Sequence, residues 1–508
     1  MNLKRREFIK ISSITAAGSL IVPPFFNSCK GVRLSDNAES YLNHFEVTKD
    51  LLQKVISAAM EKGADYADLF FEHTLENYSS LEDGKVNSAY SNIGYGVGIR
   101  VLKGEQTGYA YSESITADAM LKAARTAANI ADGTAVVSPV RINEFISPSY
   151  YPLKTSWEDT SVKDKIPFIQ RMNDNIFAAD KQVIKVNAVL GDSTSYILFF
   201  NSDGELAWDY RPMVLLYGVC IMEKNGQVEN FFVGRSHRMG SEFLTNELID
   251  ELSKEVVAKT SLLYSATKPK AGEMEVVMGA GESGILLHEA IGHAFEADFN
   301  RKNTSIFSDK MGQKVAEDFV KIVDDGTLQG KRGAINFDDE GNPTEKTVIV
   351  NNGILTSYLH DRISANYYKV NPTGNGRRQD FRNIPIPRMR CTYMENGPHK
   401  RDEIIASVKN GVYVESFSNG EVNIGQGDFT FFVKLGYLIE NGKLTKPIKD
   451  FNIIGNGPQA LADMIMVGDD LEINNGIWTC GKDGQGAPNS MGIPTVKIKK
   501  LTVGGITV

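Results

Sequence analysis

The sequence predicts an α+β protein with two large lobes: an N-terminal lobe of helices on an antiparallel or mixed sheet, and a C-terminal β-rich lobe. The chain has 508 residues, too many for a single hydrophobic core, so two or three domains are expected. Segments that alternate apolar with polar residues are joined by Gly-, Asp- and Asn-containing turns, which is typical of antiparallel strands. Apolar residues also recur at helical spacing in several stretches between these strands.

Residues 1–30 stand apart from the fold. Lys4–Lys10 contains a twin-arginine pattern, and a weakly apolar run from Ile11 to Phe26 follows it. We interpret the segment as a twin-arginine-type export signal, which predicts a periplasmic protein. The run is too short, and too interrupted by Pro23-Pro24, to span a bilayer, so no transmembrane segment is expected. Cys29 occupies the place of a lipoprotein cysteine, so a lipid-anchored lipoprotein is one alternative; a chance tail on a cytoplasmic protein is another.

Residues 31–133 are predicted to form an N-terminal α+β domain. Residues 31–45 have the composition of a polar tether, and Thr48 to Lys62 has the apolar spacing of an amphipathic helix. A second, alanine-rich helix begins at the capping residue Thr116 and runs to Asp132-Gly133. Hairpin turns at Asp83-Gly84 and Lys103-Gly104 join the expected strands, which are Ala67–Leu75, Val86–Ser91, Gly96–Leu102 and Gly108–Ser112.

Residues 134–267 are predicted to form a central β-meander with flanking helices. A connection rich in Pro and Ser leads to a helix from Val162 to about Asp180, and a second amphipathic helix covers Asn246 to Tyr264. The expected strands are Val183–Leu190, Ser195–Phe200, Leu206–Trp208, Met213–Glu223 and Gln227–Val233. Lys268–Gly272 is the clearest linker, and we place the main domain boundary there.

Residues 268–508 form the predicted C-terminal domain. It opens with a strand from Glu273 to Met278, followed by a helix from Gly284 to Glu296, and from Val315 onward strands and tight turns are expected to the end. The acidic stretches Asp324-Asp325-Gly326 and Asp338–Gly341 resemble solvated turns more than calcium ligands.

The stretch Gly279–Gly284 fits G-x-G-x-x-G between a strand and a helix, as in a dinucleotide-binding site. Such a site also needs an acidic residue about 20 residues further on. This chain has Lys302-Asn303-Thr304 at that distance. We therefore interpret the glycines as unrelated to nucleotide binding.

The helix from Gly284 to Glu296 carries the sequence His288-Glu289-Ala290-Ile291-Gly292-His293. Two histidines and a glutamate on one helix can supply two ligands to Zn²⁺ and a general base. In His-Glu-x-x-His the histidines are four residues apart, about 40° around a regular helix, but here they are five apart, about 140°. A π-type bulge would return both to one face, and Gly292 is the residue best able to tolerate it. Two histidines satisfied in a core are the alternative.

A catalytic zinc site needs one more protein ligand. The candidates are Glu296, Asp298, His360 and the cysteines. Cys480 stands out because it lies among glycines and polar residues, in an expected loop, which suits a thiolate that meets a metal. Cys391 is close behind it. The residues alone leave this choice open.

Composition excludes some classes of protein. The formal net charge is −8, which argues against a nucleic-acid-binding protein. The cysteines Cys29, Cys220, Cys391 and Cys480 are scattered without CxxC spacing, so no disulfide framework is inferred.

From about residue 50 to its end, the chain closely resembles the TldD/PmbA family, also labelled modulator of DNA gyrase, and specifically its TldD branch. The family's metal motif is HExxxH, which is the spacing of His288 and His293. Stretches that carry the resemblance include Gly96–Arg100, Gly104–Ser112, Arg211–Val214, Gly292–Arg301, Val323–Thr327, Gly374–Arg378, Pro385–Met389, Tyr437–Lys443 and Cys480–Gln485.

The resemblance implies a zinc metallopeptidase that acts on extended or unfolded peptides. Carried over by position, His288, His293 and Cys480 are the metal ligands. Glu289 is the catalytic residue that takes a proton from the metal-bound water and passes it to the leaving amine. A non-catalytic peptide-binding or partner subunit is the alternative function.

The resemblance also implies a dimer, either with a TldE/PmbA-like chain or with a second copy, around an enclosed site. The basic stretch with Arg377, Arg378, Arg382, Arg388 and Arg390 either grips substrate or forms a solvated or interface face, and we favour the second. Family members are usually cytoplasmic, whereas the N-terminus of this chain predicts export. A role in scavenging or maturing peptides in the cell envelope fits that location.

Overall fold

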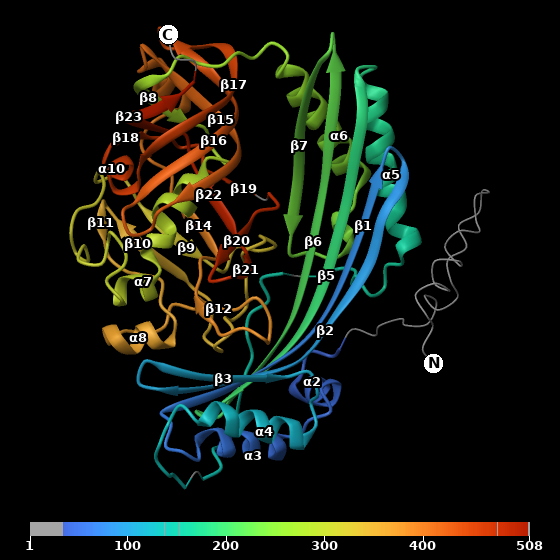
Figure 1. Cartoon of the computed structure of the whole chain (residues 1–508), viewed down its shortest axis with the longest axis vertical. Coiled ribbons are helices and arrows are strands. Elements are labelled where there is room, and N and C mark those ends of the chain that lie inside the picture. The colour runs from blue at the N-terminus through green and yellow to red at the C-terminus, as the bar shows by residue number, and fades with distance from the viewer. Residues whose placement is uncertain (1–33, 137, 152, 475, 506–508) are drawn as a thin grey trace.

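The computed structural model describes residues 34–505 except 137, 152 and 475. Two lobes lie side by side along most of the length of the molecule (Figure 1). The predicted signal at residues 1–30, and with it Cys29, lies outside the described residues. Within the described part, none of the helices combines the length and apolar character needed to cross a membrane.

One long, twisted sheet forms the first lobe. Its order is β3-β2-β1-β5-β6-β7, and every neighbour in this series is antiparallel. The short β4 (Asn143–Phe145) pairs in parallel with β6. The strands of the series are β1 (Tyr66–Glu82), β2 (Lys85–Lys103), β3 (Gln106–Ser112), β5 (Val183–Asn201), β6 (Glu205–Lys224) and β7 (Gln227–His237). The segments 31–133 and 134–267 therefore share one sheet.

Several strands are longer than the alternation pattern predicts. The predicted strands Val86–Ser91 and Gly96–Leu102 are parts of β2, because the residues between them keep their pairing with β1. The predicted turn at Asp83-Gly84 is present, with φ of 52° and 74°. Both values lie in the left-handed region that a tight hairpin turn requires. Because β1 pairs with β2 on one edge and β5 on the other, its polar stretches remain in strand conformation.

Helices cover this sheet at two places. At one end lie α2 (Ala38–His44), α3 (Lys49–Met60) and α4 (Ala117–Ala128), as Figure 1 shows. Thr116 caps α4 as predicted, and Thr48 caps α3 in the same way. The tether predicted for residues 31–45 is wrong in part, because α2 buries Tyr41 and Leu42 in the same core.

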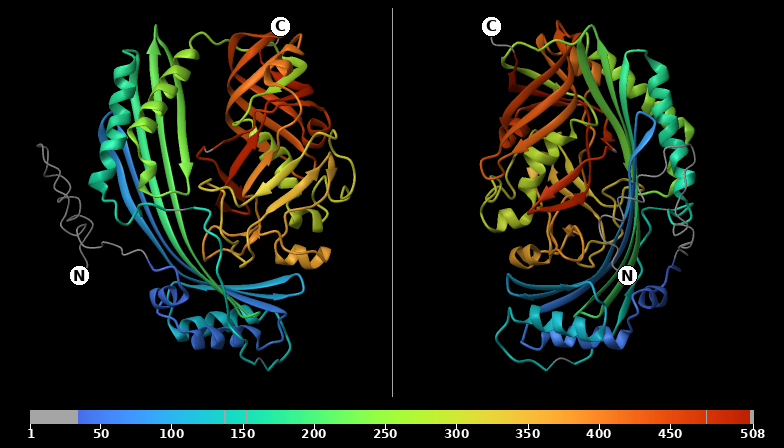
Figure 2. Two further views of the ribbon diagram at one scale, coloured as in Figure 1. Left: turned by 180° about the vertical axis from the view of Figure 1, so that it is seen from behind. Right: turned by 45° about the vertical axis from the view of Figure 1, so that its right-hand side comes forward.

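Towards the other end, α5 (Val162–Ala179) and α6 (Asn246–Leu262) lie on the side of the sheet away from the second lobe (Figure 2). Apolar residues of α5 spaced at three and four, among them Ile169, Met172 and Ile176, are fully buried against the sheet. This face supplies a core separate from that of α2–α4.

The second lobe contains a small closed barrel. Its strands follow the order β17-β16-β15-β8-β23, and β17 also pairs with β23, which closes the ring. β18 (Met464–Val467) pairs with β23 in an antiparallel arrangement. The barrel strands are β8 (Gly272–Met278), β15 (Asn410–Val422), β16 (Asp428–Glu440), β17 (Lys443–Asn456) and β23 (Val496–Gly504).

A second sheet packs beside the barrel, in the order β11-β10-β9-β14-β22-β19. These strands are β9 (Ile322–Asp325), β10 (Lys346–Asn351), β11 (Ile354–Leu355), β14 (Cys391–Met394), β19 (Glu472–Asn474) and β22 (Ser490–Ile493). Two hairpins are formed by β12 (Gly376–Arg377) with β13 (Ile386–Pro387), and by β20 (Thr479–Lys482) with β21 (Gln485–Pro488).

The expectation of strands alone after Val315 is wrong, because α8 (Arg362–Tyr368), α9 (Arg401–Ala406) and α10 (Gly457–Ala462) interrupt them. Each of these helices has six or seven residues. That is about two turns, too short for apolar periodicity to register.

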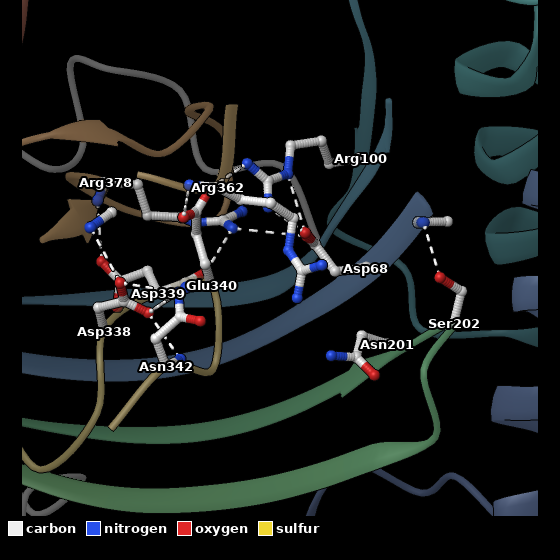
Figure 3. A network of polar contacts seen from close by, with 12 residues as sticks. Asp68, Arg100, Asn201, Ser202, Asp338, Asp339, Glu340, Asn342, Arg362 and Arg378 are labelled. Carbon is white, nitrogen blue, oxygen red and sulfur yellow. Dashed lines mark hydrogen bonds and ion pairs between the residues drawn. The ribbon is translucent and has the colours of Figure 1, made fainter. Parts of the chain in front are cut away.

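Buried ion pairs join the two lobes. Arg100 of β2 bonds Asp68 of β1 and reaches across to Glu340 at 2.5 Å (Figure 3). Arg211 of β6 bonds Asp339 at 2.6 Å. The prediction that the acidic stretches Asp324–Gly326 and Asp338–Gly341 are solvated is wrong, because their carboxylates are buried. Arginines far away in the sequence pair with them, which no local pattern reveals.

The interpretation of the arginine-rich stretch as a solvated face is also wrong for most of it. Arg377, Arg378, Arg388 and Arg390 are buried, and Arg390 bonds Asp324 at 2.7 Å. Arg382 is the half-buried member of this set, with its side chain paired to Glu113.

Candidate metal centre

The histidine motif lies on a π-helical segment, Leu286–Gly292, that continues into a short 3-10 turn, His293–Phe295. The His293 N–H donates to the His288 carbonyl, five residues back. The two imidazole rings consequently face each other, with centroids 5.0 Å apart and planes at 76°. The π distortion predicted from the five-residue spacing is confirmed.

Gly292 has an ordinary helical φ of −62°, so it is not needed there for its backbone freedom. It is needed for space. A Cβ at this position would lie 2.3 Å from Met389 Sδ and 2.8 Å from the Leu287 carbonyl oxygen. The segment is held in a core of apolar residues between the barrel and the second sheet.

The glycines of Gly279–Gly284 serve packing as well. β8 lies between β15 and β23 in the closed barrel, which is not the open parallel sheet of a dinucleotide-binding fold. Gly284 lies against the backbone of Gly492 in β22, where a Cβ would be 2.8 Å from the amide nitrogen.

Cys480 comes from β20 and pairs with Ala487 of β21, so the loop expected around it is a β-hairpin. Its Sγ lies 3.3 Å from His293 Nε2. One donor atom from each of His288, His293 and Cys480 lies within 4.8 Å of the others, and all three residues are buried. Thus residues about 190 positions apart in the sequence supply one cluster of metal-binding donors.

Glu289 also lies at this cluster, with Oε2 3.9 Å from His293 Nε2. Its side chain is 27% exposed, whereas the side chains of His293 and Glu296 are 6% and 0% exposed. A partly exposed carboxylate beside buried donors is placed to exchange protons with bound water or substrate.

The other candidates for a third ligand have different roles. Glu296 accepts from His293 Nδ1 at 2.9 Å and from Lys482 Nζ at 3.0 Å, and Asp298 accepts from the same Lys482. Both carboxylates therefore lie behind His293. His360 stacks edge-on against Tyr358 and Tyr368. Cys391 is a core residue of β14, where burial and Asp324 raise the pKa of its thiol to about 12.

The sequence reasoning missed Asn489, which follows β21. Its Nδ2 lies 2.9 Å from His288 Nδ1, and the residue is buried. A side-chain amide at Nδ1 fixes the ring of His288, and its oxygen, which accepts from Nδ1–H, is the amide atom that would leave Nε2 free for a metal. Glu296 acts on His293 in that way, because a carboxylate that accepts from Nδ1–H directs Nε2 towards Cys480. No local signal marks the Asn489 contact, whereas Glu296 lies three residues after His293.

The electrostatics favour a charged thiolate. Burial raises the pKa of Cys480, but His288 and His293 outweigh it and hold that pKa well below its usual value. Burial lowers the pKa of His293, whereas Glu296 and Cys480 raise it well above the ordinary value. Lys482 and His293 oppose the effect of burial on Glu296 and bring its pKa to about 2. Two imidazoles and a thiolate with these partners suit a divalent cation.

Comparison with known proteins identifies the family. Models for the PmbA/TldA metallopeptidase match in three parts: domain 1 at residues 67–131, the central domain at 155–264, and the C-terminal domain at 271–505.

Two bacterial relatives named "Metalloprotease TldD homolog" are each 37% identical to the chain. The protein from Buchnera aphidicola aligns over 92% of this chain and 98% of its own length, and that from Haemophilus influenzae over 93% and 99%. A protein from Saccharolobus solfataricus named "Zinc metalloprotease TldD homolog" is 28% identical over 89% of this chain and 99% of its own.

Solved structures share the fold. A protein from Thermotoga maritima called a modulator of DNA gyrase superposes with a TM-score of 0.73 at 22% identity, over 90% of this chain and 99% of its own. TldE from Thermococcus kodakarensis superposes with a TM-score of 0.69 at 20% identity, over 90% and 100%. From the family models and the near-complete alignment with TldD homologues, the chain belongs to the PmbA/TldD family of metallopeptidases.

Proposed function

We propose that this protein is a zinc-dependent peptidase, with His288, His293 and Cys480 as the metal ligands and Glu289 as the catalytic proton carrier. The observation that carries the proposal is the meeting of three buried donors with one partly exposed carboxylate. Two imidazoles and a soft thiolate match zinc better than the oxygen-preferring Ca²⁺ or Mg²⁺.

When bound, zinc supplies a lowered pKa for water and polarisation of the scissile carbonyl. Glu289 would accept a proton from water and donate it to the leaving amine, since its carboxylate is the one beside the donors that stays partly exposed. Glu296 would hold His293 in the tautomer that presents Nε2 to the site, and Asn489 would hold the ring of His288 in place.

We further propose that the substrates are extended or unfolded peptides, and that a TldE-like chain or a second copy completes the site. The structural likeness to a TldE protein supports the idea of a related partner. We also propose that the N-terminal signal directs export of the protein, either to the periplasm or to the membrane as a lipoprotein. In that location the substrates would be peptides of the cell envelope.

The test is metal content and hydrolysis of casein or peptides by the wild-type chain and by Glu289→Gln and Cys480→Ser. We expect about one zinc per chain in the wild type, retained without turnover in Glu289→Gln and lost in Cys480→Ser. Cys220→Ser is the matched control, because Cys220 is also a buried free thiol but belongs to β6 in the first lobe.

Metal bound without turnover by the isolated wild-type chain would indicate the need for a partner, or the non-catalytic role. Adding a TldE-like chain separates these two. Protein purified without chelator that holds no metal would contradict the assignment of the ligands.

A further inference from the structure

Among the residues that the structure describes, eight buried arginines fall into two groups of equal size. Those of the first group each have a carboxylate within 4.0 Å, and they are Arg100, Arg211, Arg378 and Arg390. Those of the second have none among the described residues, although they are only 0 to 7% exposed, and they are Arg238, Arg332, Arg377 and Arg388. We call the second group the unpaired arginines. Carboxylates act on three of these four only from beyond that distance: Asp209 and Asp339 on Arg238, Asp339 on Arg377, and Glu296 on Arg388.

The unpaired arginines lie together although they come from four separate segments. Arg238 acts electrostatically on both Arg332 and Arg377, and Arg388 acts on Arg377. Burial and this mutual repulsion lower the pKa of Arg332 to about 10 and that of Arg377 to about 9. The chain as a whole carries a net charge of −8, so its composition does not explain such a concentration of cations.

This group adjoins the metal centre. Arg388 donates to the carbonyl oxygen of Cys480 at 2.5 Å and to that of Gln485 at 3.1 Å, the two strands of the Cys480 hairpin. Arg332 donates to Trp478 O and to Thr479 Oγ1, the residues directly before Cys480. Two of the unpaired arginines, Arg332 and Arg388, therefore contact the hairpin that carries Cys480.

Three of the four guanidinium groups keep nitrogens without a hydrogen bond to a described residue: Arg238, Arg377 and, through its Nε, Arg388. The side chain of Arg238 makes no hydrogen bond to a described residue. Its guanidinium lies 5.5 Å from the ring centroid of Tyr151, and Asp209 and Asp339 act on its charge without forming an ion pair. Arg377 uses one terminal nitrogen, on the carbonyl of Met389 at 2.7 Å. The other terminal nitrogens of Arg238 and Arg377 are not among the fully buried unbonded atoms of the described chain, so they keep some contact with solvent.

A buried cation without a partner is costly to keep, and its removal from water is offset by hydrogen bonds and by a nearby anion. Guanidinium groups bind carboxylates through paired N–H donors. We propose that Arg238 and Arg377, backed by Arg332 and Arg388, form a subsite that binds a carboxylate of the peptide substrate beside the metal centre. This rests on the proposed function, and it predicts a preference for peptides that present a carboxylate near the scissile bond.

The bound carboxylate is either the C-terminus of the peptide or an acidic side chain. Three versions of one short labelled peptide of Ala, Ser and Gly separate them: a free C-terminus, an amidated C-terminus, and an amidated C-terminus with one internal Glu. Binding is measured by fluorescence anisotropy to the Glu289→Gln protein, and kcat/KM with the wild type.

We expect at least one carboxylate version to bind about tenfold or more tightly than the neutral amide, as charge-assisted hydrogen bonds predict. Arg238→Gln and Arg377→Gln should each bring that ratio close to one while zinc content stays unchanged. Arg382→Gln is the matched control, because Arg382 lies five residues from Arg377 but is only half-buried and is paired with Glu113. Arg377→Lys, which keeps the charge, should restore part of the preference.

Thermal unfolding distinguishes binding from a structural role. Without peptide, Arg238→Gln should melt at the wild-type temperature or above it, because a buried unpaired charge is removed. A marked fall in melting temperature would favour a structural role and count against the subsite.

Equal binding of all three versions by the parent protein would overturn the proposal, as would a ratio unchanged in both arginine variants. Loss of a dimer in these variants, with no effect on the ratio, would also overturn it in favour of an acidic segment of a partner. Carboxylate-dependent binding without any hydrolysis would leave the subsite standing and contradict the proposed function.

Discussion

At the scale of single residues, the site depends on contacts one layer behind the candidate ligands. Glu296 is fully buried and touches both His293 and Lys482, so it fixes the imidazole and balances the lysine charge. Asp298 shares Lys482 but is not among the partners of His293. Variants of Glu296 and Asp298 can therefore be compared. The comparison separates the effect of orienting the His293 ring from the effect of a negative charge near Lys482.

We predict that Glu296→Gln weakens zinc binding by about ten- to a hundredfold, because the amide holds the His293 ring less firmly and removes a negative charge. Competition with a chromophoric chelator measures the affinity. Asp298→Asn serves as the control and should have the smaller effect. Equal losses in both variants would indicate that the charge near Lys482 matters, rather than the bond to His293.

At the scale of elements, the π-helical segment is what turns a five-residue spacing into a shared site. Its geometry is maintained by tight packing: Met389 and the Leu287 carbonyl occupy the space that a side chain at position 292 would need. Core packing of this kind tolerates little added volume.

We predict that Gly292→Ala destabilises the protein by about 1–3 kcal/mol and lowers its zinc affinity, since the added methyl must displace Met389 or the backbone. Urea unfolding and metal titration measure the two effects. Gly481→Ala is the control, because a Cβ beside Cys480 would meet open space. Met389→Ala in the same chain as Gly292→Ala should recover part of the affinity. Full activity and stability in Gly292→Ala would show that the packing is looser than the geometry implies.

At the scale of the whole molecule, buried polar contacts join the two lobes beside the site. Besides Arg100 and Arg211, Glu72 of β1 accepts a hydrogen bond from the Phe381 amide of the second lobe at 2.8 Å. Burial raises the pKa of Glu72 to about 7 from 4.5, although Thr74 and Phe381 bond to the carboxyl. Because the folded pKa is the higher one, the folded state binds the proton more tightly than the unfolded chain.

The resulting stability is fully present below pH 4.5 and is lost as the pH rises towards 7. We therefore predict that Glu72→Gln, a neutral isostere, resembles the wild type at pH 4.5 and gains on it up to pH 7. The relative gain is at most about 3 kcal/mol, from the 2.5-unit difference between 4.5 and about 7. Denaturant unfolding at several pH values measures it. A difference independent of pH would rule out this titration.

The sequence by itself determined much of the local structure: the capped helices at Thr48 and Thr116, the Asp83-Gly84 hairpin, and the π distortion between His288 and His293. These follow from residues that interact within a few positions of one another. The family resemblance, carried by ordered motifs, is confirmed by the comparisons.

Only the tertiary structure decided which distant residues meet. It brought Cys480, rather than Cys391, beside the histidines, placed Asn489 and Glu296 behind them, and buried the acidic turns against arginines. It also left Arg238 and Arg377 without a carboxylate of the described residues within 4.0 Å. The sequence shows that a residue is charged, but it does not show whether the side chain lies in water, in an ion pair or buried without a partner. The free energy of that charge depends on burial and partners, which the packing of two lobes creates.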